Sequence, residues 1–183
     1  MPSLRPATNT DQQAIIELIT NVYREYGETM CLENADKDLL DIEANYAQKG
    51  GAFVVLENSG DEKLNGNKHN RIIAAHATLP IDSEKGLVTF RRLYSTTEVR
   101  GTGVGVTMMG WALNWAIENK FTDVQFWSDT RFERAHTFFA KFGLAKGHTR
   151  DMNDGYEPYS EYRFTMTLPS QPIDWSKHIA DLP

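Results

Sequence analysis

The first half of the chain switches between helical and strand-like spacing of its apolar residues. A short strand over residues 4–8 precedes a capping box at Thr10–Gln13, which opens a helix that runs to Tyr26. A second helix is predicted over residues 36–46 and stops before two glycines. Strands are then predicted over residues 52–56, 71–79 and 87–94, with a polar hairpin loop at 59–70. Three successive strands joined by turns favour an antiparallel meander.

The second half alternates single helices with single strands. A helix over residues 105–119 carries apolar residues on two stripes, so we expect it to be covered on more than one side. Next come a strand over 121–127 and a helix that a capping box at Thr130–Glu133 opens and Gly143 closes. Strand, helix and strand in this order imply a parallel pair with a helical crossover. One or two strands, the last over 160–168, close the sheet.

These elements predict an α/β fold of the mixed α+β kind. We expect a mixed, mostly antiparallel sheet of six to seven strands flanked by about four helices. We assign residues 1–168 to one domain, because 183 residues is an ordinary size for a single-domain protein. Residues 169–183 form a polar tail, whose Ile173 and Trp175 we expect to dock on the body or on a partner.

Composition narrows the classes of partner. The formal net charge is −6 and no dense Lys/Arg run occurs, which disfavours nucleic-acid binding and is compatible with a cationic amine substrate. The single cysteine, Cys31, cannot form an internal disulfide. The N-terminus lacks a signal-peptide pattern, and no stretch reaches the roughly 18–20 apolar residues that a membrane span requires. We therefore expect a soluble, cytoplasmic protein that binds neither nucleic acid nor membrane.

A glycine-rich segment between a strand and a helix has the features of a phosphate site. The segment is Arg100-Gly101-Thr102-Gly103-Val104-Gly105. The first N–H groups of a helix have no internal partner, and the helix dipole makes that end partly positive. Glycines let successive amides face an anion, and Arg100 adds a charge-assisted contact. The sequence therefore predicts phosphate binding here, with a simple tight turn as the alternative.

Two other phosphate-binding motifs fit this segment poorly. A Walker A loop needs Lys followed by Ser or Thr after its glycines, whereas Val104-Gly105-Val106 stands here. A dinucleotide-binding fingerprint needs a third glycine where Val106 stands, although an acidic residue, Asp129, does follow the next strand. The segment also follows an antiparallel meander, which is not where a nucleotide-binding half-sheet would place it.

The spacing Arg-x-x-Gly-x-Gly from Arg100 to Gly105 resembles the acyl-CoA-binding loop of the GNAT superfamily of N-acetyltransferases. Leu93–Ser95 resembles the fourth strand of that family. The helix over Ala135–Leu144 is similar to its next conserved helix, which ends in glycine and a large apolar residue. The order of elements matches over roughly residues 3–168.

The resemblance implies a V-shaped sheet, in which the fourth and fifth strands splay apart around the pantetheine arm of acetyl-CoA. It also implies direct transfer from the thioester to the amine, without a covalent enzyme intermediate. Backbone groups of Leu93, Tyr94 and Ser95 would bind the pantetheine arm. The residues implied to hold the pyrophosphate are Arg100, Gly101, Thr102, Gly103, Val104, Gly105 and Val106.

The chain departs from the family at two positions. Many members carry Asn where Phe132 stands, and a Tyr that protonates the departing thiolate where Phe139 stands. Neither phenylalanine can donate a proton or a hydrogen bond. Arg131 or Arg134 is a candidate for the lost polar contact to the cofactor, with a solvated helix face as the alternative.

Proton transfer must then involve other residues. An ammonium with a pKa of about 10.4 has to lose a proton before it attacks, so a base is useful. Asp129 at a strand end is our candidate base, with capping of the next helix as the alternative. Glu98 is expected at the surface, and His76 as a packed strand histidine. Tyr94 is the candidate acid, and the further tyrosines are Tyr156, Tyr159 and Tyr162.

Adjacent strand residues Arg91 and Arg92 are expected on opposite faces of the sheet. One of them would face the acceptor and favour a carboxylate-bearing substrate, with a solvated sheet surface as the alternative. The five histidines lack ligand spacing and there is no cysteine pair, so no metal site is expected.

The function that we predict is acetyl transfer from acetyl-CoA to a primary amine of a small molecule, peptide or protein. The alternative is a non-catalytic acyl-CoA-binding module, which Phe139 in place of Tyr motivates. A nucleotide-dependent oxidoreductase is a third reading. An amine acceptor is the expected partner, and a homodimer is compatible with the sequence.

Overall fold

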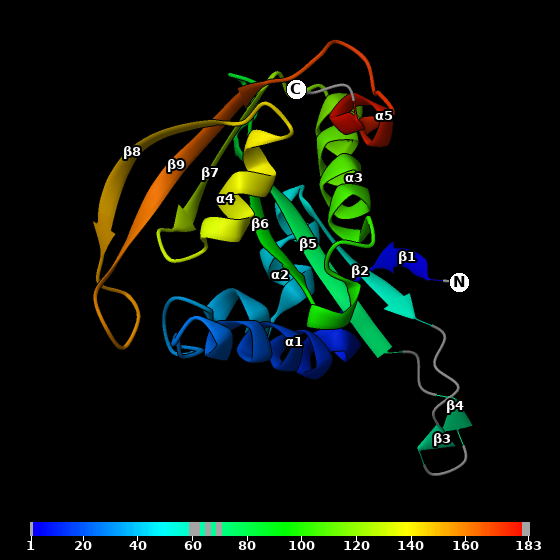
Figure 1. Ribbon diagram of the computed structural model, residues 1–183, viewed down its shortest axis with the longest axis vertical. Helices are drawn as coiled ribbons and strands as arrows, with labels where there is room; N and C mark the ends of the chain where they lie inside the picture. Colours follow the sequence, from blue (N-terminus) through cyan, green and yellow to red (C-terminus); the bar gives the residue numbers. More distant parts are fainter. Residues whose placement is uncertain (1, 59–62, 65–66, 69–70, 181–183) are drawn as a thin grey trace.

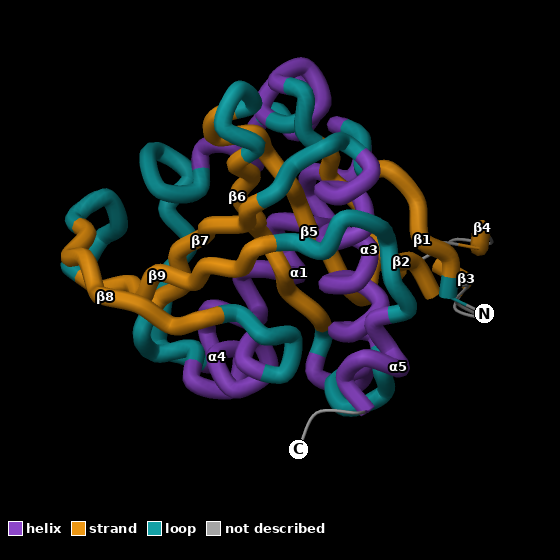
Figure 2. The backbone as a smooth tube through the Cα atoms, turned by 90° about the horizontal axis from the view of Figure 1, so that it is seen from above, coloured by secondary structure: helices purple, strands orange, loops and turns teal. Residues whose placement is uncertain are grey.

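A seven-stranded mixed sheet forms the centre of the protein, with strand order β1-β2-β5-β6-β7-β9-β8 (Figures 1 and 2). The computed structural model describes residues 2–58, 63–64, 67–68 and 71–180. The strands of the sheet are β1 (Ser3–Pro6), β2 (Ala52–Asn58), β5 (Arg71–Asp82), β6 (Leu87–Ser95), β7 (Asp123–Asp129), β8 (Ala145–Met152) and β9 (Tyr159–Thr167). All neighbours are antiparallel except β6 and β7, which are parallel. The prediction of a mixed, mostly antiparallel sheet of six to seven strands is confirmed.

Helices cover both faces of this sheet. They are α1 (Gln12–Glu25), α2 (Ile42–Asn45), α3 (Val104–Glu118), α4 (Glu133–Ala140) and α5 (Trp175–Ala180), with 3-10 turns at Asn9–Asp11, Lys37–Leu40, Ala47–Lys49 and Thr97–Val99. Ile19 of α1 shares a core with Val55 of β2. On the other face, Leu113 of α3 and Phe139 of α4 share a core with Phe126 of β7. No helix in the described ranges is long and apolar enough to cross a bilayer.

Two local predictions in the first half need correction. The capping contact lies upstream of the expected one, because the Thr8 N–H donates to Asp11 Oδ2 at 2.9 Å and a 3-10 turn precedes α1. The helix expected over 36–46 is divided, because Asp41 is extended (φ −153°) and caps α2 by accepting from the Ala44 N–H at 3.0 Å. Of the expected polar loop, β3 (Lys63–Leu64) and β4 (Asn67–Lys68) form a small ladder, and the rest of 59–70 lies outside the described residues.

The second half also differs in detail from the sequence prediction. Thr130 does not cap α4, which begins after Phe132 instead. The Arg131 N–H donates to Asp129 Oδ1 at 2.9 Å, so the strand end itself supplies the acceptor. Gly143 lies just after the end of α4 and has φ +83°. This left-handed backbone is typical of a glycine that ends a helix, as the sequence predicted. Both β8 and β9 close the sheet, and β8 gave no clear signal because it is an almost wholly exposed edge strand.

The parallel pair β6–β7 is joined only at its beginning. Leu87 pairs with Asp123 and Val88 with Val124, and beyond these residues the two strands diverge (Figure 1). Each strand remains paired on its other edge, β6 with β5 and β7 with β9. The splay between the fourth and fifth main strands, which the resemblance implied, is therefore present.

His76 of β5 is a packed strand histidine, as expected. Its side chain is 0 % exposed, and Nδ1 lies 3.0 Å from the Met108 carbonyl of α3. The rings of Phe90 and Trp111 contact it edge-on. Burial lowers the pKa of His76 to about 4, against a smaller opposing effect of the bond to Met108. The imidazole is therefore neutral near pH 7.

We predict that acid destabilises the protein through His76. The unfolded chain takes up a proton near the ordinary histidine pKa of about 6.5, whereas the folded state resists it until about pH 4. The free energy of unfolding should fall by about 2 kcal/mol between about pH 7 and pH 4.5 through this group. In His76→Leu that part of the decline should be absent, as measured by urea unfolding at both pH values. An equal decline in both proteins would contradict the prediction.

The C-terminal segment docks on α3. Trp175 is 3 % exposed, and its indole Nε1 donates to Asn114 Oδ1 at 2.8 Å. The same Asn114 bonds the backbone of Ile173 at both its N–H and its carbonyl. A Cβ on Gly110 would lie 3.3 Å from the Trp175 side chain, so the glycine permits this close approach. Of the two expected docking places, Trp175 therefore uses the body of the protein.

Trp175→Ala should lower the free energy of unfolding by about 3–5 kcal/mol, because it empties a filled site in the core. Chemical denaturation measures the loss. Gln171→Ala, an exposed position in the same segment, is the matched control and should change stability by less than about 0.5 kcal/mol. Similar small losses in both variants would show that the segment contributes little to stability.

Candidate active site

A cleft of about 720 Å³ opens where β6 and β7 diverge. The free ends of both strands line it, over residues 90–95 of β6 and 126–129 of β7. The glycine loop, α4, the segment between α1 and α2, and the β8–β9 hairpin form the remaining walls. The glycine loop and both splayed strands therefore face one common space.

The glycine loop presents backbone amides to this cleft. Gly101 and Gly103 adopt left-handed backbone with φ +79° and +93°, and a Cβ added at either would meet no atom within 4 Å. α3 begins directly after Gly103, and its first turn lines the cleft through Gly105 and Val106. The N–H groups of such a turn lack partners within the helix, so they are available to an anion. Thr102 and Val104 belong to the same loop, but their side chains do not line the cleft.

Arg100 is held by a carboxylate of α1. Its Nη2 donates to Glu25 Oε1 at 2.8 Å and to the Ser95 carbonyl at 3.3 Å. The guanidinium therefore joins the loop both to the end of β6 and to the end of α1. It lines the cleft, but Glu25 offsets its charge.

The two candidate arginines near α4 lie in different surroundings. Arg131 pairs with Asp129 and with Glu28 of the segment after α1, and it does not line the cleft. Arg134 lines the cleft on the loop side, and no hydrogen bond or ion pair joins it to another residue of the described ranges. Lys141 lines the same side of the cleft. Arg134 is therefore the freer of the two cations.

The wall that β6 contributes contains all three residues implied for the pantetheine arm. Leu93, Tyr94 and Ser95 line the cleft, and β7 does not pair with them. The Tyr94 hydroxyl donates to the Tyr23 hydroxyl at 3.4 Å, and burial raises the pKa of Tyr94. Phe132, in the place of the family's Asn, packs against the rings of Tyr23, Tyr26 and Tyr94.

A row of charged residues crosses the three strands beyond the splay. Asp129 of β7 is paired in register with Glu161 of β9, which is in turn paired with Arg150 of β8. Side chains at paired positions share one face of the sheet with Cβ atoms about 4.5–5.5 Å apart. Arg150 Nε donates to Glu161 Oε2 at 2.7 Å and stacks over the Trp127 ring. Asp129 is 7 % exposed and accepts from Arg131 Nε at 2.9 Å.

Glu161 is a cleft carboxylate that the sequence reasoning missed. Burial raises its pKa, the bond to Arg150 opposes this, and the charges of Asp154 and Asp129 raise it further. Only the pairing of β9 with β7 brings Glu161 beside Asp129, and no local spacing reveals that pairing. Asp154, which also lines the cleft, accepts from the Tyr159 hydroxyl at 2.8 Å.

The other named candidates lie further from the cleft or on its other side. Glu98 is exposed, pairs with Arg71 at 3.2 Å and does not line the cleft. Tyr156 donates to Glu33 at 2.8 Å, outside the cleft lining. Ser128, which lines the cleft, lies 3.3 Å from Nε2 of His136 on the α4 side of β7.

A bulge in β6 corrects the expectation for Arg91 and Arg92. Arg92 has φ +60°, and β6 holds one extra residue opposite the stretch from Ala75 to Ala77 of β5. The bulge breaks the alternation of side chains. Arg92 reaches Asp38 on the α1 side of the sheet, and Arg91 is paired with Ala77, which packs in the core on that same side. Both arginines therefore lie on the same face.

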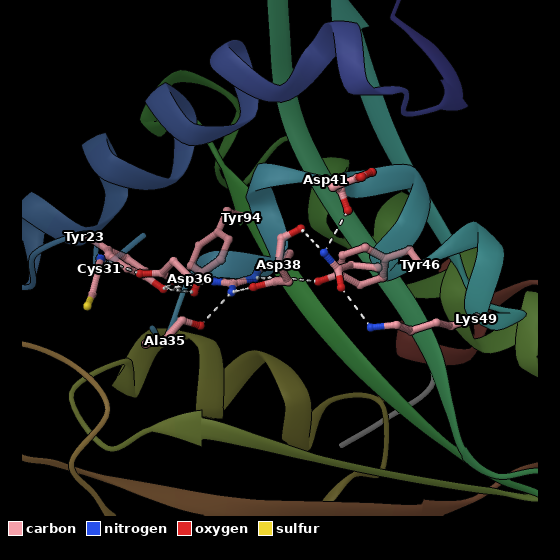
Figure 3. Close-up of polar contacts among 11 residues, drawn as sticks. Tyr23, Cys31, Ala35, Asp36, Asp38, Asp41, Tyr46, Lys49 and Tyr94 are labelled. Atoms are coloured by element: carbon pink, nitrogen blue, oxygen red, sulfur yellow. Dashed lines mark hydrogen bonds and ion pairs between the residues drawn. The ribbon is translucent and has the colours of Figure 1, made fainter. Parts of the chain in front are cut away.

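Arg92 is the centre of a buried polar network beneath the cleft. It is 8 % exposed, and it donates to Asp36 Oδ1 at 2.6 Å and Asp38 Oδ2 at 3.1 Å. Figure 3 shows Asp36 and Asp38 side by side, with Tyr46 directed at Asp38. The Cys31 N–H donates to Asp36 at 2.8 Å, which fixes the segment after α1. Arg92 therefore has a structural role and is not free to bind an acceptor.

Known proteins were compared with this chain by sequence and by structure. No protein-family model matches it, and no curated protein matches it. A GNAT-family acetyltransferase from Staphylococcus aureus Mu50 aligns with a TM-score of 0.77 over 92 % of this chain and 100 % of that one, at 15 % identity. An acetyltransferase from Streptococcus agalactiae 2603 aligns at 0.72 over 91 % and 98 %, with 17 % identity. A GNAT superfamily phosphinothricin acetyltransferase from Sinorhizobium meliloti, in complex with AcCoA, aligns at 0.68 over 93 % and 90 %, with 16 % identity.

These alignments cover nearly all of both chains at low sequence identity, so what they establish is the fold. The architecture of this chain combines a splayed parallel pair of strands with a glycine loop before α3 and the strand order given above. The chain has the fold of the GNAT superfamily of acetyltransferases.

Proposed function

We propose that this protein is an N-acetyltransferase that transfers the acetyl group of acetyl-CoA directly to a primary amine. The observation that carries the proposal is that the glycine loop and the splayed ends of β6 and β7 line one cleft. In the reaction, the amine nitrogen bonds to the thioester carbonyl carbon and the carbon–sulfur bond breaks. A proton leaves the nitrogen and another reaches the departing thiolate. Acetyltransferases of the same fold, one of them in complex with AcCoA, support this assignment.

The residues on the loop side fit the cosubstrate. The amides of Gly105 and Val106, at the positive end of α3, would bind the pyrophosphate. The open space over Gly101 and Gly103 would allow a bulky anion to approach the backbone. Backbone groups of Leu93–Ser95, which β7 leaves unpaired, would bind the pantetheine arm. Arg134 would add a cation, and Arg100 would hold the loop in place.

The carboxylate pair Asp129–Glu161 would accept the amine proton. Both line the cleft on the face away from α4, and each also has an arginine partner. Glu161 is the stronger base of the pair in our proposal, because burial raises its pKa. Asp129, clamped by Arg131, would hold the ammonium in place.

The thiolate proton would come from Tyr94 or from solvent. Phe139 has no proton to donate, and it packs against Phe126 and Phe164. Tyr94 lines the cleft, and its hydroxyl donates to the Tyr23 hydroxyl. A thiol is a good leaving group, with a pKa of about 8.5, so catalysis does not depend on a dedicated acid.

A non-catalytic acyl-CoA-binding module remains the second candidate. The observation that favours it is that Phe132 and Phe139 both pack into aromatic clusters instead of offering polar groups to the cleft. Release of coenzyme A thiol in the presence of an amine separates the two candidates, because only an enzyme produces it.

Gly103→Trp should abolish acetyl-CoA binding, because the indole would fill the space over the loop amides. Calorimetric titration of acetyl-CoA should give a dissociation constant in the micromolar range for the wild type and no heat for the variant. Gly143→Trp is the matched control. Gly143 has φ +83°, meets no atom within 4 Å of an added Cβ and does not line the cleft, so it carries the same backbone strain.

If both glycine variants bind as the wild type does, the loop is not the phosphate site. If the folded wild type binds no acetyl-CoA, the proposed function is wrong. Binding that only Gly103→Trp loses assigns both the cosubstrate and the loop.

Glu161→Gln should lower kcat about 100-fold or more with binding of acetyl-CoA unchanged, because the amide cannot accept a proton. In the wild type, kcat/KM should fall as the pH drops through the raised pKa of Glu161, and this acid limb should be absent from the variant. Asp151→Asn, an exposed carboxylate of β8 outside the cleft lining, is the control and should keep the wild-type profile. An unchanged acid limb in Glu161→Gln would exclude Glu161 as the base.

A further inference from the structure

The cleft has two halves that lie on opposite faces of the sheet. Phe90 and Phe126 pack into the core under α3 and α4, on the face that these helices cover. Asp129 lies on the other face of β7, because side chains alternate along a strand. Its partner Arg131 reaches Glu28 after α1, which is consistent with that placement. The cosubstrate would thus enter on the α3 side, and the acceptor must approach from the α1 side.

Most arginines on the acceptor side are neutralised by carboxylates. Arg92 is paired with Asp36 and Asp38. Arg150 is paired with Glu161, and Arg131 with Asp129 and Glu28. The carboxylates therefore offset the positive charge of Arg92, Arg131 and Arg150.

Arg91 is different. It is exposed and lines the cleft, and within the described residues no hydrogen bond or ion pair occupies its guanidinium. It immediately precedes the Arg92 bulge, so the buried network beneath it fixes its backbone. Its charge acts on Asp38, but that carboxyl is already bonded by Arg92 and Tyr46. The five donors of Arg91 are therefore available to a molecule in the cleft.

The opposite wall of the acceptor half is acidic. Glu161, Asp129 and Asp154 line it from β9, β7 and the β8–β9 hairpin. A guanidinium binds a carboxylate in a bidentate manner, and carboxylates bind an ammonium. The acceptor half thus offers a cation on the β6 wall and anions on the facing wall.

We propose that the acceptor is a primary amine that also carries a carboxylate, such as an amino acid, and that Arg91 binds this carboxylate while Glu161 and Asp129 face the amine. The inference rests on the proposed acetyl transfer and adds the acceptor class to it. A polyamine fits less well, because its second ammonium would lie near the unpaired Arg91. The phosphates of the cosubstrate do not explain Arg91 either, because the glycine loop follows the end of β6 at Ser95, whereas Arg91 lies four residues earlier in the strand.

The test compares matched amines that differ only in the carboxylate. Amino acids with the amine at the α, β and γ position are each assayed beside their carboxamide and their decarboxylated amine, by release of coenzyme A thiol. The wild type should prefer the acid about 10-fold or more in kcat/KM. Arg91→Gln should lose this preference mainly through a higher KM, with kcat for the carboxamide unchanged, and Arg91→Lys should retain part of it.

Arg24→Gln is the matched control. Arg24 is an exposed arginine of α1 that does not line the cleft, so its loss should leave the preference intact. Equal turnover of acid and carboxamide by the wild type would overturn the proposal while leaving the acetyltransferase function in place. An equal loss for all three amines in Arg91→Gln would also overturn it, since that would show a general structural effect.

A binding measurement gives an answer that does not depend on turnover. Each amine of the panel is titrated calorimetrically into the protein saturated with coenzyme A. Binding of the acid alone, lost in Arg91→Gln, would support the carboxylate site even if no amine were acetylated, whereas the acetyl-transfer proposal would then fail. Binding of the carboxamide as tightly as the acid would overturn the site whatever the enzyme does.

Discussion

The buried guanidinium of Arg92 joins the two parts of the chain on which the cleft depends. A buried charge is costly unless opposite charges and hydrogen bonds surround it. Asp36 and Asp38 supply the charges, and the Ala35 carbonyl accepts a further bond at 3.2 Å. Burial is the largest single effect on the pKa of the Asp38 carboxyl and would raise it. The charge and hydrogen bonds of Arg92, with smaller contributions from Arg91 and Tyr46, together outweigh burial and keep that pKa below its ordinary value. Removing any one partner would leave a buried charge unmatched, so the segment after α1 and the bulge of β6 are held together.

The bulge in β6 and the splay between β6 and β7 together determine which side chains line the cleft on each face of the sheet. Because β6 and β7 pair only through Leu87 and Val88, the backbone of the later residues of β6 has no partner in β7. That edge and the first turn of α3 both line the cleft. On the α1 side Arg91, which is paired with Ala77 just before the bulge, lines the same cleft as the carboxylates of β7 and β9. The geometry thus brings the first turn of α3 and the carboxylates of β7 and β9 to one opening.

Phe132 and Phe139 have clear packing roles. Phe132 lies 4.8 Å, centroid to centroid, from the ring of Tyr26 and belongs to a cluster with Tyr23 and Tyr94. Phe139 lies 5.0 Å from Phe126 and fills the core under α4. Both side chains bury apolar surface, which stabilises the walls of the cleft. The titratable side chains of the cleft, Tyr94, Asp129 and Glu161, therefore come from β6, β7 and β9.

The sequence by itself determined the features that depend on neighbours along the chain. Apolar spacing marked α1, α3, α4 and most of the strands, and the glycine loop was recognisable because one continuous segment carries it. The prediction placed the first helix cap two residues late, at Thr10 instead of Thr8, and did not foresee the break at Asp41. In both places several neighbouring polar residues are able to cap a helix. Edge strand β8 gave no periodic signal, since it has no buried face.

Tertiary structure alone decided which distant residues meet. The Arg92 bulge breaks the alternation that two adjacent arginines would otherwise show, and the guanidinium that it buries is bonded by Asp36 and Asp38, far away in the sequence. Asp129 and Glu161 are neighbours only because β9 lies between β7 and β8 in the sheet. Trp175 packs against α3 because Gly110 has no side chain to block it. Local sequence sets the conformation of each element, whereas burial and strand pairing set which charges face one another, and the chemistry of the cleft depends on the latter.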